Sequence, residues 1–492
     1  MENNIYEVAI VGAGFAGIGT AIKLKQAGKD NFLILERASE VGGTWRDNTY
    51  PGCGCDVQSH LYSFSFEPNP DWSRKFSKQP EILEYLKKCT QKYHLREHLK
   101  FNTEILSTIF DETKGYYKLS TKTGEQILAR TVVFAIGGLN KSKLPNIKGL
   151  ETFSGQVFHS SAWNHSISLQ NKKVAVIGTG ASAIQFVPEI APIVEKLIVF
   201  QRTAPWIIPK PDKKMGNFTK NLFKKIPFFQ FLYREFIFWM NELMGLAFLG
   251  SKPISKVATL MAKSHIKAQI KDENLREKVT PNYAFGCKRV LISDDYYPAL
   301  QRDNVELNTD NIDYIVQNKI IDKQGKSHQV DVIIMGTGFL VSELPPKFVK
   351  ENTISGLAGK NLFETWKSKG LESYKGLMVS GFPNLIYMVG PNSGLGHNSI
   401  IHIIESQISY IMSFLEALSQ KPMPYYLNVN PEIQYRYNQT LQENFKGTVW
   451  EKGCGSWYVN DSEKNVTLWP KLNGAYRKET EAINSTDFIE SM

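Results

Sequence analysis

The 492-residue sequence predicts an α/β protein with two parallel-sheet units and a helical insertion in the second unit. Two glycine-rich turns, at 12–17 and 178–183, each lie between a short apolar strand and a helix, the pattern of a strand–helix–strand unit. The stretch at about 210–282 is rich in Lys, Phe and Met at helical spacing, which predicts the insertion. At roughly 150 residues per domain, the chain is long enough for about three structural units.

The first unit begins with a predicted strand at 7–11, followed by a glycine turn, a helix at 16–27 and a strand at 32–35 that ends in Glu36. Alternating apolar residues then predict an antiparallel meander and a strand that returns to the first sheet. The segments with this alternation are 101–110, 116–121 and 126–135.

The second unit repeats the order, with strands at 174–177 and 197–200 around a helix that runs to about Ile193. A buried strand near 331–335 ends in another glycine turn, and the remaining chain, with a helix at 398–418, is expected to return to the first unit. We therefore expect the first domain to span 1–145 and 341–492, and the second to span 146–340.

Composition limits the partners and the compartment. The 58 Lys and Arg residues exceed the 48 Asp and Glu residues by ten, but they are scattered, so we expect anionic cofactors and no nucleic-acid partner. Five cysteines are an odd number without a C-x-x-C pair, which indicates neither a disulfide framework nor a metal site. These cysteines fit a reducing cytoplasm, and the N-terminus lacks the basic and apolar regions of a secretory signal.

The most apolar stretch, 226–250, is interrupted by Arg234, Glu235 and Glu242, so it does not predict a membrane span. We expect a buried helix there. The alternative is an amphipathic helix in weak contact with a membrane surface, which would make the protein peripheral to the membrane.

The first glycine turn predicts a dinucleotide site. Gly12, Gly14 and Gly17 fit the G-x-G-x-x-G pattern, with Phe15 inside it, and Glu36 closes the next strand 24 residues after Gly12. The helix N-terminus would face a pyrophosphate, and the carboxylate would accept hydrogen bonds from ribose hydroxyls. This arrangement suits an unphosphorylated ribose, as in FAD.

The second turn predicts a different nucleotide. Gly178, Gly180, Ser182 and Ala183 lie in a G-x-G-x-x-A variant, but the following strand ends in Gln201-Arg202-Thr203 instead of a carboxylate. A guanidinium suits the 2′-phosphate of NADPH, which a carboxylate would repel. Two NAD sites with an incidental Arg202 are the alternative. Two dinucleotide sites imply hydride transfer from a nicotinamide to a flavin.

The electrons then need an acceptor. Pyridine nucleotide-disulfide reductases share this layout of two Rossmann-like domains, the glutathione-reductase-like fold, and they use a redox-active cysteine pair. The close pair Cys53-Gly54-Cys55 is too short for the usual C-x4-C or C-x-x-C loop, so we interpret these thiols as packing residues. Oxygen remains as the acceptor.

Two long motifs identify a family. Gly43-Thr44-Trp45, Tyr50-Pro51-Gly52 and Asp56 fit G-x-W-x4-[FY]-P-[GM]-x3-D, and 153–163 fits F-x-G-x3-H-x3-W with His159 and Trp163. The chain resembles the type I Baeyer-Villiger monooxygenases over nearly its whole length. The resemblance includes three further segments, 285–289, 336–339 and 454–458.

The resemblance implies that NADPH reduces FAD, that oxygen forms a peroxide on the flavin C4a carbon, and that a ketone becomes an ester or lactone. Arg289 matches the arginine that stabilises the peroxide, and Asp56 matches the carboxylate that orients this arginine. Lys288 and Arg202 match the residues that bind the 2′-phosphate. The alternative for Arg289 and Asp56 is a structural salt bridge. The alternative for Lys288 and Arg202 is that they are solvated surface charges. The aromatic insertion suggests an apolar carbonyl substrate.

His159 and Trp163 join the two units, so they are candidates to govern movement of the nicotinamide during turnover, with a core histidine as the alternative. For His397, before the last long helix, we expect a role in the turn.

Asn164 stands where the family usually has Pro or Asp. The related flavin-containing monooxygenases, which oxidise sulfur or nitrogen, lack the Trp of the second motif. Oxidation at S or N therefore stays an alternative, as does a flavoprotein reductase that inserts no oxygen.

Overall fold

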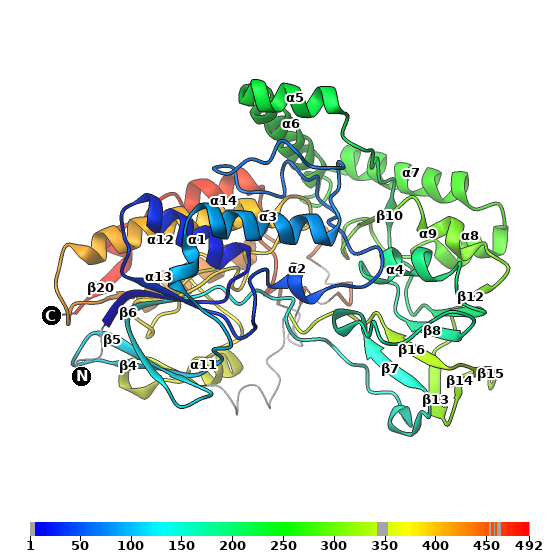
Figure 1. Ribbon diagram of the computed structural model, residues 1–492, viewed down its shortest axis with the longest axis horizontal. Coiled ribbons are helices and arrows are strands. Elements are labelled where there is room, and N and C mark those ends of the chain that lie inside the picture. The colour runs from blue at the N-terminus through cyan, green and yellow to red at the C-terminus, as the bar shows by residue number, and fades with distance from the viewer. Residues whose placement is uncertain (1–4, 342–352, 452–453, 457, 460–463, 492) are drawn as a thin grey trace.

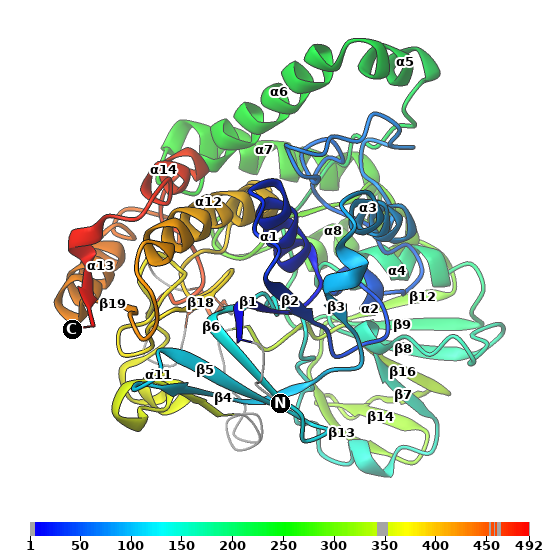
Figure 2. The ribbon, with the colours of Figure 1, turned by 60° about the vertical axis from the view of Figure 1, so that its left-hand side comes forward.

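The computed structural model describes residues 5–341, 353–451, 454–456, 458–459 and 464–491. Figure 1 shows two sheet-based units side by side, with a group of green helices projecting beyond them, and Figure 2 shows the same arrangement after rotation. The predicted α/β fold class is confirmed.

The first sheet has the order β17-β4-β5-β6-β1-β2-β3, and β18 also pairs with β6. Strand β1 is parallel to both β2 and β6, while β4, β5 and β6 form the antiparallel meander. Strands β17 and β18 come from the last third of the chain and pair in parallel with β4 and β6. The bounds are β1 Ile5–Val11, β2 Phe32–Leu35, β3 Leu99–Lys100, β4 Ile105–Asp111, β5 Tyr116–Thr121, β6 Gln126–Phe134, β17 Thr353–Ser355 and β18 Leu385–Tyr387.

Helix α1 (Phe15–Gln26) packs between this sheet and α12 (Ile400–Ser419), and α3 (Gln79–Lys92) also contacts α1. Nine of the twelve residues of α1 are buried because helices and sheet surround it. The remaining elements of this unit are α2 Thr44–Asp47, α11 Leu362–Lys369, α13 Pro431–Glu443, α14 Asn473–Glu479, β19 Leu427–Val429 and β20 Phe488–Glu490.

The second sheet is fully parallel, in the order β12-β9-β8-β16-β7. Strand β16, between β8 and β7, is buried at every position, which explains the continuous apolar run in the sequence. Helices α4 (Ala183–Ile190) and α9 (Tyr296–Leu300) pack against each other beside it. The strands are β7 Gln156–His159, β8 Lys173–Ile177, β9 Lys196–Phe200, β12 Val305–Asn308 and β16 Val332–Met335, and a small sheet contains β13 Ile312–Val316, β14 Lys319–Asp322 and β15 Ser327–Gln329.

The insertion is helical, as the spacing predicts. Its helices are α5 Asn217–Lys225, α6 Pro227–Gly245, α7 Lys252–Gln269 and α8 Glu273–Val279, enclosed by the short pair β10 Ile207–Ile208 and β11 Leu291–Ile292. In the described part of the chain, no helix is long and apolar enough to cross a membrane.

The prediction of a buried helix at 226–250 is wrong. Helix α6 exposes most of its aromatic side chains, including Phe236 (61 % exposed) and Trp239 (62 % exposed). It buries Arg234 and Glu242 instead, because partners on other elements satisfy those charges. One of these partners is His397, which hydrogen-bonds Glu242 beneath the helix and so does more than form a turn.

The expectation of no disulfide is also wrong. Cys287 and Cys454 form one, although they lie 167 residues apart, because the fold brings their Cα atoms to 6.1 Å. An odd count and the absence of a C-x-x-C pair say nothing about a bridge that tertiary structure creates. Cys53, Cys55 and Cys89 are free and buried.

We predict that Gly17→Ala destabilises the protein strongly. A Cβ at Gly17 would lie 1.9 Å from the carbonyl oxygen of Gly12, so the first glycine turn and α1 would have to separate. Overpacking of this kind costs up to about 3 kcal/mol. Urea unfolding checks it, with Gly216→Ala as the control, since a Cβ there meets nothing within 4 Å. Equal stability of the two variants would contradict the close packing of this turn.

Candidate active site

The first glycine turn forms a cradle lined by backbone. Gly12 has a φ of +108°, and a Cβ there would lie 2.6 Å from the carbonyl oxygen of Ala135. The loop of Gly43 crosses the turn so closely that a Cβ on Gly43 would lie 3.2 Å from the Cα of Gly14. Thr44 then starts α2 at this crossing. A pyrophosphate at the N-terminus of α1 needs such an approach by bare backbone, so these residues fit a dinucleotide.

Glu36 is fixed at the edge of this cradle. Its Oε2 accepts a hydrogen bond from the backbone N–H of Ala13 at 2.9 Å, and its Oε1 lies 3.0 Å from a guanidinium nitrogen of Arg46. The sequence reasoning missed Arg46, although a basic residue directly after Trp45 was a signal. The carboxylate is thus oriented beside the turn, where a ribose would lie.

Phe15 and Trp45 support the cradle by packing. Phe15 makes edge contacts with Tyr62 and Phe64, each with ring centroids 5.3 Å apart. The indole N–H of Trp45 donates to the hydroxyl of Tyr62 at 3.1 Å. Both motif residues therefore hold the glycine turn against the segment that follows Asp56.

The second glycine turn has the same close packing. Gly178 has a φ of +104°, and a Cβ there would lie 2.5 Å from the carbonyl oxygen of Gly336. A Cβ added at Gly180 would meet only this oxygen within 4 Å, at 3.9 Å, so one side of the turn is open. Ser182 and Ala183 begin α4 directly behind it. The geometry fits a second pyrophosphate at a helix N-terminus.

Two cations lie near this second turn. Burial and the nearby charge of Arg202 lower the pKa of Lys288. Thr203 follows Arg202 and accepts a hydrogen bond from the Thr179 hydroxyl through its carbonyl. Within the described residues, neither cation forms an ion pair, so both charges are available for a dianionic phosphate.

Asp56 and Arg289 join the two units. An oxygen of Asp56 lies 2.5 Å from a guanidinium nitrogen of Arg289, 233 residues away, and the side chains are 26 % and 42 % exposed. The carboxylate raises the pKa of Arg289. Burial would raise the pKa of Asp56, but Arg289 outweighs it and the pKa is lowered. Arg289 therefore stays protonated, and its guanidinium remains partly accessible.

Gln185, which the sequence reasoning missed, fastens the loop that carries Asp56. Its Oε1 accepts hydrogen bonds from the Tyr50 hydroxyl at 3.1 Å and from the Gly54 N–H at 3.2 Å. Its Nε2 donates to the Gly54 carbonyl at 3.0 Å. Because Gln185 lies on α4 of the second unit, this amide sets the position of Asp56 relative to Arg289. In the sequence, the one indication of a role for Gln185 was its position directly after the second glycine turn.

The Arg289 loop is tied down on its other side. The indole N–H of Trp450 donates to the carbonyl of Gly286 at 3.0 Å, and the Cys287–Cys454 disulfide links the loop to the segment after Trp450. Trp457, in the last family motif, lies outside the described residues. The bridge therefore fixes the residues immediately before Lys288 and Arg289.

A cleft of about 450 Å³ opens beside Gln185. It lies along α4 and α9, and three basic side chains line it, Lys78, Lys210 and Arg302, together with Glu189 and Asp295. Burial lowers the pKa of Lys210. The sequence did not single out these residues, because their convergence depends on the packing of distant elements.

His159 and Trp163 lie where the two units connect. His159 is buried at the end of β7, where its Nδ1 accepts a hydrogen bond from the Ser161 N–H at 3.1 Å. Burial lowers its pKa. Trp163 packs on Phe158 and Phe186. No hydrogen bond or ring contact in the described part of the chain joins either side chain to Asp56 or Arg289.

The thiols of Cys53 and Cys55 are poorly suited to redox chemistry. Burial raises the pKa of Cys53 to about 11 and raises that of Cys55 further. A thiol with a raised pKa forms little of the thiolate that attacks in thiol–disulfide exchange. The two cysteines belong to the hydrophobic core.

Comparison with known proteins agrees with this site. Residues 9–226 match the family model of pyridine nucleotide-disulphide oxidoreductases. A Baeyer-Villiger monooxygenase of Pseudomonas aeruginosa is 46 % identical over 484 residues, which cover 98 % of this chain and 91 % of the relative.

Solved structures extend the similarity to the whole fold. The OTEMO complex with FAD and NADP has a TM-score of 0.86 at 26 % identity and full coverage of both chains. Cyclohexanone monooxygenase from Rhodococcus sp. Phi1 bound to NADP+ has a TM-score of 0.86 at 27 % identity and 97 % coverage of each chain. The chain belongs to the Baeyer-Villiger monooxygenase family.

Proposed function

We propose that the protein is an FAD- and NADPH-dependent monooxygenase that inserts one oxygen atom of O2 next to a ketone carbonyl, giving an ester or lactone. The observation that carries this proposal is the Asp56–Arg289 pair, which places a permanent cation where the two nucleotide-binding units meet. A reductase that inserts no oxygen would have no need of this cation.

Each unit suits one cofactor. FAD would bind the first unit, 1–145 and 341–492, in the cradle of Gly12, Gly14 and Gly43 with Glu36 at its edge. NADPH would bind the second unit, 146–340, with its 2′-phosphate between Arg202 and Lys288. The helical insertion at 210–282 interrupts this second unit.

When bound and reduced by NADPH, the flavin supplies the chemistry that activates O2. Arg289 would hold its positive charge where negative charge develops on oxygen, both at the attacking group and at the carbonyl of the substrate. Asp56 orients the guanidinium, and Gln185 positions Asp56. Because the contacts are set before reaction, little reorganisation is required of these residues.

His159 and Trp163 would act as positioning residues. His159 ends β7, which pairs with β16, and its ring makes an edge contact with Phe339 in the following turn. Trp163 packs on Phe186, which in turn contacts Tyr50 of the Asp56 loop. A shift between the units would move both side chains, in line with a role in relocating the nicotinamide.

The departure from the family pattern at Asn164 has only local contacts. Its side-chain oxygen accepts hydrogen bonds from the N–H and hydroxyl of Ser166, as an aspartate would in the same turn. Asn164 therefore keeps this turn intact, and the departure gives no argument against ketone oxygenation. The substrate would be a small apolar carbonyl compound, and the location the cytoplasm, with peripheral contact to a membrane through 226–250.

Arg202→Ala is expected to weaken binding of NADPH by roughly 10- to 150-fold, since a charge-assisted contact contributes about 1.5–3 kcal/mol. Binding of NADH should change little, because it lacks the 2′-phosphate. Lys288→Ala should act in the same direction. Titration of both coenzymes with each variant measures the preference, and equal losses for NADPH and NADH would contradict the phosphate assignment.

Replacement of Cys53 and Cys55 with Ser is expected to leave NADPH-dependent oxygenation largely intact, apart from a packing cost. The electrons would leave through flavin and oxygen, and the raised pKa of Cys53 already argues against thiol chemistry. The measurements are ester yield and FAD content. Loss of turnover in a folded variant that retains FAD would support a disulfide reductase instead.

Arg289→Ala is expected to retain FAD and its reduction by NADPH but to form little or no ester, with electrons lost to hydrogen peroxide. The charge of Arg289 acts on the oxygen step, not on binding of either cofactor. Asp56→Ala should have a milder effect, because it frees the guanidinium without removing it.

Anaerobic flavin reduction, peroxide yield and ester yield from one preparation separate these steps. An ester yield close to that of the unmodified protein would exclude Arg289 from the mechanism. Loss of FAD would show that the Asp56–Arg289 pair is structural.

A further inference from the structure

Helix α6 has its polar and apolar faces reversed relative to an ordinary surface helix. Its buried side includes three polar or charged side chains, Gln230, Arg234 and Glu242. Its exposed side is apolar and holds Phe228, Phe229, Phe231, Leu232, Phe236, Trp239, Met240 and Leu243. A soluble monomer rarely exposes a contiguous apolar surface of this size, and such surfaces mark sites of interaction.

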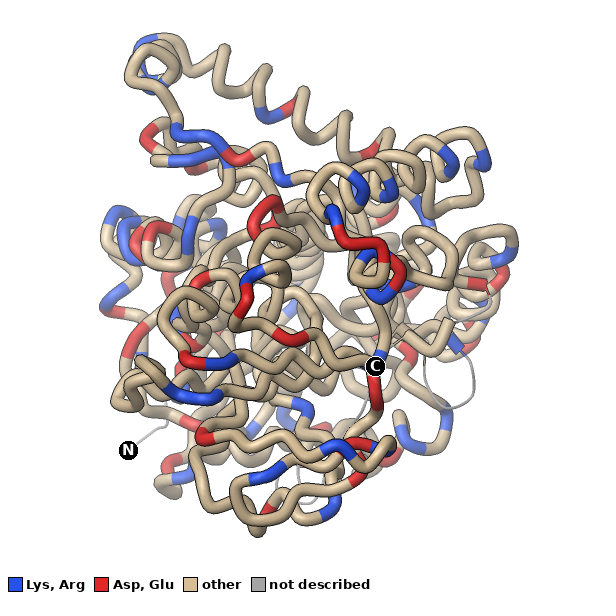
Figure 3. The backbone as a smooth tube through the Cα atoms, turned by 90° about the vertical axis from the view of Figure 1, so that its right-hand side faces the viewer, with Lys and Arg blue, Asp and Glu red and all other residues tan. Residues whose placement is uncertain are grey.

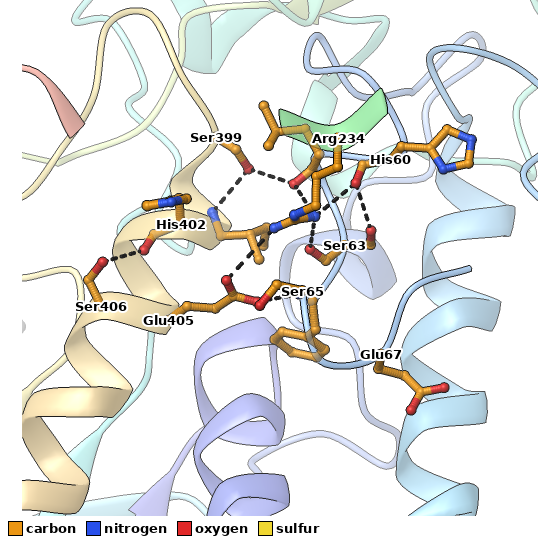
Figure 4. A network of polar contacts seen from close by, with 12 residues as sticks. His60, Ser63, Ser65, Glu67, Arg234, Ser399, His402, Glu405 and Ser406 are labelled. Carbon is orange, nitrogen blue, oxygen red and sulfur yellow. Dashed lines mark hydrogen bonds and ion pairs between the residues drawn. The ribbon is translucent and has the colours of Figure 1, made fainter. Parts of the chain in front are cut away.

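Arg234 fixes the rotation of α6 near its middle. Arg234 is 8 % exposed, and its guanidinium donates to the carbonyls of His60 at 2.8 Å and Ser63 at 2.9 Å. Glu405 of α12 lies 3.7 Å away as the opposite charge. Figure 4 shows Arg234 enclosed by the 60–65 segment and the start of α12.

Glu242 fixes the C-terminal end of α6. Glu242 is 3 % exposed, and its carboxylate accepts hydrogen bonds from His397 Nε2 at 3.0 Å and Asn398 Nδ2 at 2.8 Å. The backbone N–H groups of Asn473 and Gly474 add two more at 3.2 Å. Turning the helix to bury its aromatic face would pull both charges away from these partners and leave buried groups such as His397 and Glu405 without theirs, so the aromatic face is held outward.

The surroundings of this face are basic. Residues 211–270 contain ten Lys and Arg residues against three Asp and Glu residues. Figure 3 shows α6 without charge along most of its length, between blue segments of α5 and α7. Within the described residues, Lys224 is the one lysine of this segment with an ion pair, to Asp71.

We propose that α6 docks the protein onto an anionic lipid bilayer, with its aromatic face in the acyl–headgroup boundary and the lysines of α5 and α7 at the headgroups. An aromatic face with basic flanks is the pattern of an interfacial helix. A second copy of this chain would bring the same lysines against each other. The helices project from the body of the molecule, so other elements do not shield the face (Figures 1 and 2).

The segment just after α6 contacts the loop that carries Arg289. Phe248, just after α6, packs on Phe285 with ring centroids 6.0 Å apart, four residues before Arg289. Docking would bring an apolar ketone dissolved in the bilayer close to this loop. This consequence rests on the proposed function, whereas the docking itself does not.

Flotation with vesicles tests the docking without any turnover. The protein is mixed with vesicles of phosphatidylcholine and phosphatidylglycerol, and with vesicles of phosphatidylcholine alone. We expect binding to the anionic vesicles that weakens with salt. Phe236→Ser with Trp239→Ser should lower the partition coefficient by on the order of tenfold or more.

Lys225→Glu at the end of α5 and Lys252→Glu at the start of α7 should each lower the partition coefficient by about fivefold. Tyr435→Ser and Lys369→Glu are matched controls on exposed positions outside the insertion, and they should bind like the unmodified protein. FAD content and circular dichroism establish that each variant is folded. NADPH oxidation is measured separately, so failure of oxygenase activity and failure of docking are distinguishable.

Three results would overturn the proposal: no binding to anionic vesicles, equal binding by the aromatic variants, or equal loss in the controls. Sedimentation velocity adds a fourth. If the unmodified protein is a dimer that Phe236→Ser with Trp239→Ser dissociates, the face is a contact between copies instead.

Discussion

The ion pair between Asp56 and Arg289 is the contact on which the rest of the site depends. Each unit forms its glycine turn from local sequence, but the reaction centre exists only where the loop before Asp56 meets the loop before Arg289. Gln185 fixes the first loop, and the Cys287–Cys454 bridge fixes the second. Because both side chains are partly exposed, the pair contributes little to folding stability, and its importance lies in geometry.

The features that the sequence predicted are those set by short spacing. A turn that passes close to a neighbouring carbonyl requires glycines at fixed positions, and these are visible within a few residues of sequence. The carboxylate or guanidinium that would contact the ribose is likewise found at the end of the next strand. Gln185 and the disulfide could not be found this way, because their partners lie 131 and 167 residues away. The family motifs gave Asp56 and Arg289, but not the residues that hold them.

Helix α6 shows a different limit. Hydropathy counts how apolar a segment is, and by that measure 226–250 belongs in a core. What decides the buried face is the set of partners on other elements, and Arg234 and Glu242 have theirs on four segments distant in the sequence. A buried charge with good partners costs little once formed, whereas the same charge without them is strongly destabilising. The charged residues that interrupt the apolar run therefore orient it.

The protein thus uses charges in two opposite settings. Arg234 is enclosed and bonded to carbonyls, so burial lowers its pKa and its charge serves only to hold a helix in place. Arg289 has a carboxylate partner but stays 42 % exposed, so its charge is secured and can still act on a substrate. The two settings meet at Phe248, which lies between α6 and the Arg289 loop. A rigid α6 therefore also supports the position of the reactive cation, since movement of the helix would be transmitted through that ring contact to the loop.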